Sequence, residues 1–187
     1  MATLIPENYK CLFFVLLLLS CPLSVARCAW LFYVMELFVD FQGFKDSTNT
    51  FIIKEIAIAS TDGQYFQHWI VRSPYPFATL DYKTKRQCNW VTHYYHGIHW
   101  QDGDTTVQNL HRQLEALLQE SVVYVKGLEK ANYIKEFFNS QMVIDLENYP
   151  SLKSLHNHAV TCLFHARHDG KVCALNNVLK LVQYHCQ

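Results

Sequence analysis

The chain has 187 residues, a length typical of a single domain. Half of the residues are apolar and 14% are aromatic, which excludes an intrinsically disordered chain. The 16 Lys and Arg residues balance the 16 Asp and Glu residues, so the sequence lacks the strongly basic arm that often marks a nucleic-acid-binding protein. Ten His and seven Cys are the unusual part of the composition, because these side chains bind metal ions when they cluster.

The amino terminus is the most apolar part of the chain. Residues 11–19 form an uninterrupted apolar run, with Lys10 before it, Pro22 after it and small residues up to position 28. This layout is typical of a secretory signal peptide, and the run is too short to span a bilayer comfortably. Residues 1–28 are therefore interpreted as a signal peptide or as a hydrophobic N-terminal extension. The first interpretation makes the protein secreted, and the second makes it intracellular.

Residues 35–187 are predicted to form one domain that begins with three strands. The first strand contains Asp40 within an apolar run and ends at Gly43, and an Asp62-Gly63 turn joins the second strand to the third as a hairpin. The three strands are predicted at residues 37–44, 50–60 and 65–72.

Helices and strands are predicted to alternate in the rest of the domain. Residues 79–93 have weak helical character, whereas Val107, Leu110, Leu114 and Leu118 recur at clear helical spacing. Short strands at 121–125 and 142–145 then alternate with helices at 128–138 and 174–184. This order predicts an α/β fold with a mixed five-stranded sheet and helices on both faces. It is also the order of elements in the ribonuclease H-like fold.

Asp40 is the first candidate for a functional residue, because an acid inside an apolar strand is costly unless it is paired or bound to a metal. The segment Val39-Asp40-Phe41-Gln42 resembles the first motif of the DEDD-type 3'-5' exonucleases of the ribonuclease H-like superfamily. Residues 123–137, which include Glu129, resemble the second motif, and residues 173–178, which include Asn177, resemble the third. The chain also resembles a family without an assigned activity that shares DFQGF, HGIxW, VKGxEK and CALxNV, here at 40–44, 96–100, 125–130 and 173–178.

The resemblance implies a metal-binding set of acids at Asp40, Gln42, Glu129 and Asn177, but this sequence departs from the pattern. Gln42 and Asn177 are amides where active relatives have acids, and Glu129 is only the nearest candidate for the second-motif acid. Two divalent cations need several carboxylates, so a magnesium- or manganese-dependent reaction is expected to be weak or absent.

A second constellation lies near the carboxyl terminus. Cys162, His165, His168 and Cys173 have a spacing typical of structural zinc sites, in which four nitrogen and sulfur ligands form a tetrahedron. Either zinc or a Cys162–Cys173 disulfide could cross-link this polar segment, and the sequence leaves both alternatives open.

The leading hypothesis is a catalytically impaired, exonuclease-derived ribonuclease H-like domain that acts as a binding or scaffolding module, with nucleic acid as its candidate partner. The first alternative is an active metal-dependent nuclease that uses Asp40 and Glu129, with Asp145 as a further acid. The second is a secreted, disulfide-bearing protein of unrelated role. Tyr94 and Tyr95 fit either base stacking or the core. No glycine-rich loop indicates a small-molecule cofactor, and no motif indicates a particular protein partner.

Overall fold

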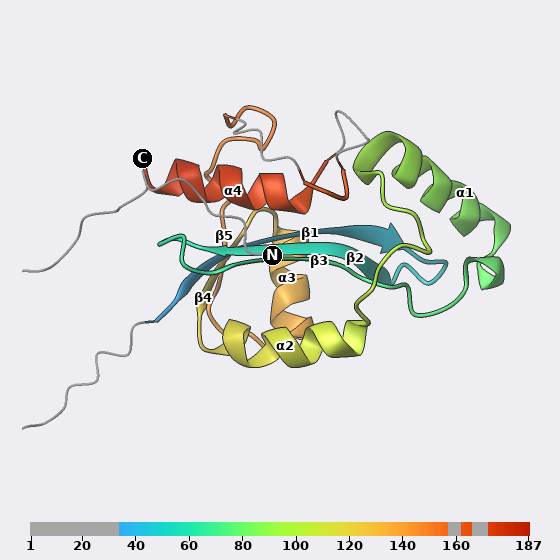
Figure 1. Cartoon of the computed structure of the whole chain (residues 1–187), viewed down its shortest axis with the longest axis horizontal. Helices are drawn as coiled ribbons and strands as arrows, with labels where there is room; N and C mark the ends of the chain where they lie inside the picture. The colour runs from blue at the N-terminus through green and yellow to red at the C-terminus, as the bar shows by residue number, and fades with distance from the viewer. Residues whose placement is uncertain (1–33, 157–161, 166–171) are drawn as a thin grey trace, which may run out of the picture.

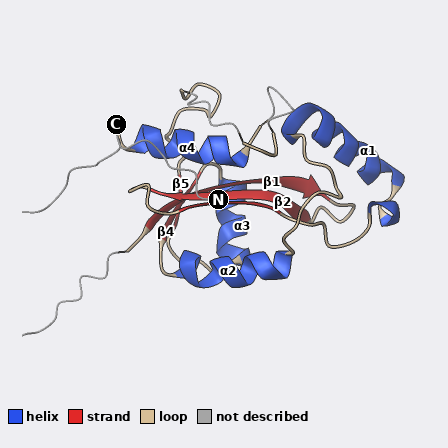
Figure 2. Ribbon diagram, in the orientation of Figure 1, coloured by secondary structure: helices blue, strands red, loops and turns tan. Residues whose placement is uncertain are grey.

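The computed structural model describes residues 34–156, 162–165 and 172–187. These residues form a five-stranded sheet that lies between helices (Figures 1 and 2). The predicted α/β class, with a mixed sheet and helices on both faces, is confirmed. The predicted signal peptide or extension at 1–28 lies outside the described residues. In the described part of the chain, no helix is long and apolar enough to cross a membrane.

The strands are arranged in the order β3-β2-β1-β4-β5. Their bounds are β1 Glu36–Lys45, β2 Phe51–Ser60, β3 Phe66–Ile70, β4 Val122–Val125 and β5 Val143–Asp145. The first three strands pair antiparallel, and β4 and β5 continue the sheet in parallel from β1. Gly63 has the positive φ of 70° that a tight turn between β2 and β3 requires, which confirms the predicted hairpin. Asp40 therefore lies on the central strand.

The helices cover the two faces unequally. Their bounds are α1 Tyr82–Val91, α2 Val107–Gln119, α3 Leu128–Phe137 and α4 Ala174–His185, with short helices η1 Phe77–Thr79 and η2 Thr92–His96 before and after α1. Figure 1 shows α2 and α3 below the sheet, α4 above it, and α1 beyond one end of the strands. The helical turn predicted from Pro150 to Leu155 is a turn in the structure, and residues 150–156 form no helix.

Alternation along the central strand divides the core into two layers, because successive strand residues point to opposite faces. Leu37, Val39 and Phe41 pack in the layer that also contains leucines of α2 and the apolar residues of α3. Phe38 packs on the other face, with Val178 and neighbouring residues of α4. Asp40 is two residues after Phe38 and points to the same face of the sheet, so its carboxylate lies beneath α4.

Gly43 does not end the first strand, as the sequence suggested, but lies inside it. The register of β1 against β2 shifts at this point, because Gln42 pairs with Glu55 and Gly43 pairs with Ile53. The extra residue, Lys54, makes the bulge in β2, and β1 continues to Lys45. A Cβ atom at Gly43 would lie 2.1 Å from the backbone oxygen of Ile52. The strands can approach this closely only because residue 43 has no side chain.

The substitution Gly43→Ala is expected to destabilise the protein by about 1–3 kcal/mol, because the β1–β2 pair must separate to admit the methyl group. The unfolding free energy from urea denaturation measures the effect. A change below about 0.5 kcal/mol would contradict the close approach of the two strands.

Lys54 anchors the segment that precedes α2. Its buried Nζ atom donates hydrogen bonds to Ser73 Oγ at 3.1 Å, to the Trp100 carbonyl at 2.9 Å and to the Asp102 carbonyl at 2.7 Å. Burial lowers the pKa of Lys54 to about 8, and the nearby charge of Asp102 opposes this shift. These contacts fix both ends of the 73–102 segment, which contains α1, to β2.

Buried Asp40 and a candidate metal centre

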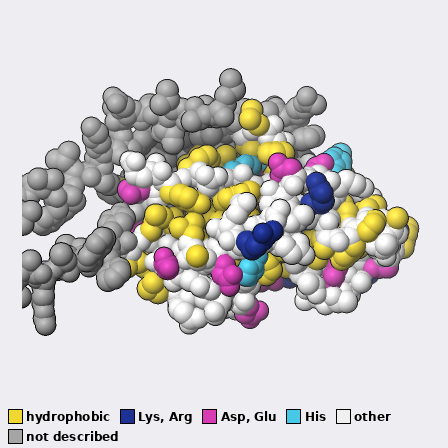
Figure 3. All heavy atoms as spheres, turned by 60° about the horizontal axis from the view of Figure 1, so that its bottom comes forward, with side chains coloured by type: hydrophobic (Ala, Val, Ile, Leu, Met, Phe, Trp, Pro, Cys, Tyr) yellow, Lys and Arg dark blue, Asp and Glu magenta, His cyan; other side chains and the backbone are white. Residues whose placement is uncertain are grey.

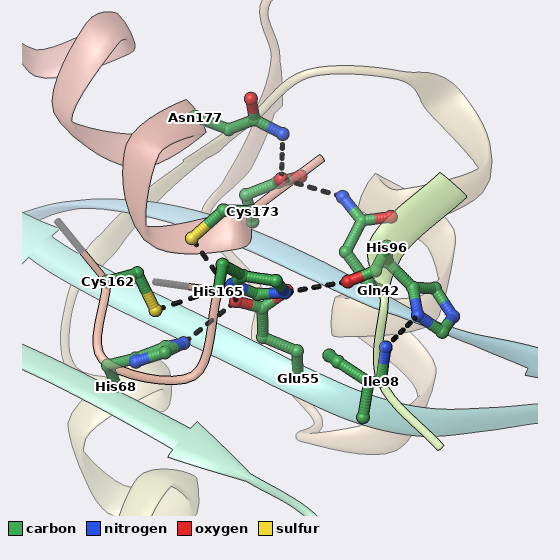
Figure 4. Close-up of polar contacts among 10 residues, drawn as sticks. Gln42, Glu55, His68, His96, Ile98, Cys162, His165, Cys173 and Asn177 are labelled. Atoms are coloured by element: carbon green, nitrogen blue, oxygen red, sulfur yellow. Dashed lines mark hydrogen bonds and ion pairs between the residues drawn. The ribbon is translucent and has the colours of Figure 1, made fainter. Parts of the chain in front are cut away.

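The carboxylate of Asp40 is fully buried and accepts hydrogen bonds from three nitrogen donors. The Lys130 ammonium donates to Oδ1 from α3, and Asn177 Nδ2 donates to Oδ2 from α4 at 2.7 Å. Gln42 Nε2, two residues along the same strand, donates to Oδ2 at 3.3 Å (Figure 4). The structure therefore brings together three of the four predicted motif residues, and it adds a lysine.

Glu129 is not part of this group. Its side chain is 82% exposed, and its carboxylate pairs with Lys45 at 2.5 Å. Asp145, the further acid considered for a nuclease, accepts a hydrogen bond from the Gly127 backbone at 2.8 Å. Among the described residues, no group of three or more His, Cys, Asp and Glu side chains with metal-binding geometry includes Asp40.

A second buried acid, Glu55, lies on the same face of the sheet. The register of β1 and β2 places Glu55 opposite Gln42, and paired residues share a face. Like Asp40, Glu55 therefore lies on the side that α4 covers. Its carboxylate meets the turn at residues 162–165 and the start of α4 (Figure 4).

Four buried side chains, Glu55, Cys162, His165 and Cys173, could hold a metal ion together. One ligand atom from each lies within 4.8 Å of all the others. The distances are 3.4 Å from Cys162 Sγ to His165 Nδ1, 3.5 Å from Cys173 Sγ to Glu55 Oε1 and 3.8 Å from His165 Nδ1 to Glu55 Oε1. The edges of a tetrahedron with metal–ligand bonds of about 2.0–2.3 Å have nearly these lengths, about 3.3–3.8 Å.

Neighbouring groups orient two of these ligands. His165 Nε2 lies 2.7 Å from the His96 carbonyl, which can only accept, so Nε2 carries the proton and Nδ1 faces the cluster. His68 Nε2 lies 2.9 Å from Glu55 Oε1 and holds the carboxylate from β3. Glu55 Oε2 is buried and has no hydrogen-bond partner among the described residues. A buried carboxylate oxygen with no partner is costly, and a bound cation would satisfy it.

The two thiols of the cluster differ in acidity. The hydrogen bond from Cys173 lowers the pKa of Cys162 and raises that of Cys173, and a further bond with His165 also favours the Cys162 thiolate. For His165, burial lowers the pKa, but the hydrogen bond with Cys162 and the charge of Glu55 outweigh it and raise the pKa overall. The thiolate is the form of cysteine that binds metals, so Cys162 is in the metal-binding form, whereas Cys173 would release its proton when a metal binds.

The sequence predicted three of these ligands. Cys162, His165 and Cys173 come together as expected, whereas His168 lies outside the described residues. Cys88, Cys162 and Cys173 form no disulfide in the structure. Glu55 was missed, although a charged pair, Lys54-Glu55, inside an otherwise apolar strand was a signal that could have found it.

No protein-family model matches the chain, and no curated protein matches it. The functional conclusion therefore depends on the two buried clusters and on the topology of the sheet.

Proposed function

We propose that the chain is a ribonuclease H-like domain of exonuclease descent that binds nucleic acid without cutting it. The strand order β3-β2-β1-β4-β5, with a central strand that carries Asp40, supports this interpretation. The closing helix α4 also supports it, because it presents Asn177 to Asp40 where the resembled exonucleases present an acid. A shared fold alone does not define an activity, so the loss of catalysis is argued from the site.

The observation that carries the proposal is the set of partners around Asp40. Two-metal hydrolysis needs several carboxylates around a pair of cations. Here one carboxylate is surrounded by two amides, and the Lys130 ammonium contributes the positive charge that a metal ion would otherwise supply. A divalent cation would have to displace Lys130 and would gain a single anionic ligand.

Purified protein is therefore expected to leave single- and double-stranded DNA and RNA uncut in millimolar Mg²⁺ or Mn²⁺. Gel electrophoresis of end-labelled substrates after prolonged incubation measures this. Asp40→Ala, prepared in parallel, is the control for a contaminating nuclease. A contaminant would cut the substrates equally in the wild-type and the variant preparations. Robust metal-dependent cleavage that disappears in Asp40→Ala would overturn the proposal in favour of the active nuclease.

We further propose that the metal of the Glu55, Cys162, His165 and Cys173 cluster is a structural zinc ion. Two sulfur donors and one imidazole nitrogen favour zinc over magnesium or calcium, which prefer oxygen ligands. Four protein ligands complete a tetrahedron and leave no open position for a reacting water. The zinc would tie β2 to the 162–165 turn and to the start of α4, and so fix the helix that presents Asn177.

A further inference from the structure

An exposed ladder of aromatic and cationic side chains runs along α1 into η2. Tyr82, Arg86, Trp90 and Tyr94 follow one another at intervals of four residues, which places them along one side of a helix. The aromatic side chains are 75% exposed at Tyr82, 59% at Trp90 and 65% at Tyr94. Tyr94, for which the sequence left a core position open, is thus a surface residue. Figure 3 shows apolar side chains gathered at the end of the molecule that α1 forms.

Contacts within the ladder hold its rings in place. The Arg86 guanidinium lies 5.8 Å from the centre of the Tyr82 ring. The rings of Trp90 and Tyr94 lie 5.6 Å apart, tilted by 39°. Cys88, on the opposite side of α1, is buried in the cluster with Trp100, which donates a hydrogen bond to the Tyr75 carbonyl at 2.8 Å. The ladder is therefore a preordered surface, and a ligand that binds it loses little side-chain entropy there.

The charge around the ladder is positive, although the chain as a whole is neutral. No acidic residue occurs between Asp81 and Asp102, whereas Lys83, Lys85 and Arg86 fall within α1. The Asp81 carboxylate caps the helix by accepting from the Thr84 backbone at 3.0 Å and from its hydroxyl at 2.5 Å. Such a surface favours a polyanion.

We propose that Tyr82, Lys83, Arg86, Trp90 and Tyr94 form a binding surface for single-stranded nucleic acid. Exposed aromatic rings stack on unpaired bases, and neighbouring cations contact the phosphates. A duplex keeps its bases stacked inside, so the rings would find no partner there. This inference assigns a location to the nucleic-acid binding proposed above, and it rests on that proposal.

The composition of the surface argues against two other occupants. A helix that binds a membrane surface buries a continuous apolar face in the lipid, made of Leu and Phe side chains as well as Trp. The exposed side chains of α1 and η2 include no Leu, Ile or Phe, and Val91 packs inward. An acidic peptide would match the charge but would leave three exposed rings without the flat partners that bases provide.

The test measures fluorescence anisotropy of labelled 20-nucleotide single-stranded RNA and DNA with the full chain. Trp90→Ala/Tyr94→Ala is expected to weaken binding by about 10- to 100-fold, because stacked bases lose both rings. Lys83→Glu/Arg86→Glu is expected to weaken binding and to flatten its salt dependence. Lys135→Glu/Lys153→Glu is the matched control, since it reverses two exposed lysines outside α1 and η2 and is expected to bind more tightly than the α1 reversal.

The outcomes separate this inference from the proposed function. Wild-type protein that binds no oligonucleotide would overturn both. If the wild type and both α1 variants bind equally well, the nucleic-acid site lies elsewhere on the protein. That result would overturn the assignment of the site to α1 and leave the proposed function standing. Two further ligands, phosphatidylserine vesicles and polyglutamate, test the other occupants. If the wild type binds either of them as tightly as RNA, and Trp90→Ala/Tyr94→Ala loses that binding, the assignment of the α1 surface to nucleic acid is overturned. Unchanged thermal unfolding of the variants shows that lost binding is not lost folding.

Discussion

Removal of zinc from the purified protein is expected to lower its melting temperature by about 8–16 °C. A ligand that binds only the folded state at 1,000 times its dissociation constant contributes about 4 kcal/mol, and each kcal/mol shifts the melting temperature of a domain of this size by about 2–4 °C. The physical reason is the buried cluster itself. Without a metal, Glu55 Oε2 has no partner among the described residues, and the Cys162 thiolate lies within 4.8 Å of the Glu55 carboxylate.

The measurement combines metal analysis with thermal unfolding before and after a zinc chelator. About one equivalent of zinc is expected in wild-type protein, and Cys173→Ser is expected to lose both the metal and the response to the chelator. Cys186→Ser changes an exposed cysteine outside the cluster and should keep both. Protein without metal, with two fewer reactive thiols that return on reduction, would instead establish the disulfide alternative.

The identity of the fourth ligand has its own test. Glu55→Gln keeps the size of the side chain but removes its charge, and it is expected to weaken zinc binding by about 10-fold or more, by analogy with the cost of disturbing the partners of a metal site. His168→Ala is the comparison, because spacing alone made His168 a candidate. If His168→Ala loses zinc and Glu55→Gln retains it with unchanged affinity, the assignment of Glu55 is wrong.

Most of the fold could be predicted because its signals are local. The leucines of α2 recur at helical spacing, the Asp62-Gly63 pair favours a tight turn, and β-branched residues mark β2. Such patterns depend on the period of a helix or strand and need no knowledge of distant contacts. The close approach at Gly43 depends on a distant contact, since the residue that Gly43 must approach, Ile52, belongs to another strand.

The sites could be predicted only in part, because their residues meet through tertiary contacts. Cys162 and His165 are three residues apart, so spacing reveals them, whereas Glu55 joins them only through the register of β2 and the docking of α4. The acid expected in the second motif was assigned to Glu129, yet the next residue reaches Asp40. Successive helix residues point in directions about 100° apart, so a shift of one residue replaces a carboxylate near Asp40 with an ammonium.

Lys130→Met is expected to destabilise the protein by about 3–5 kcal/mol, because it leaves a buried charge without its counter-ion. The Asp40 side chain is 1% exposed, and after the substitution its remaining side-chain donors among the described residues would be the neutral amides of Gln42 and Asn177. Asp40→Asn is expected to cost less, about 1–3 kcal/mol, since the Lys130 side chain is 26% exposed and its ammonium can turn towards water. The free energy of unfolding from urea denaturation measures each change.

The double variant Asp40→Asn/Lys130→Met isolates the interaction between the two charges. It removes both charges together, so it is expected to be more stable than Lys130→Met alone, with a coupling energy of about 2 kcal/mol or more. Lys45→Met is the matched control: it breaks the exposed pair with Glu129 and should change stability by less than about 1 kcal/mol. If Lys130→Met is as mild as Lys45→Met, the ammonium does not neutralise Asp40. The charge that keeps divalent metals away from the central strand would then have to come from elsewhere.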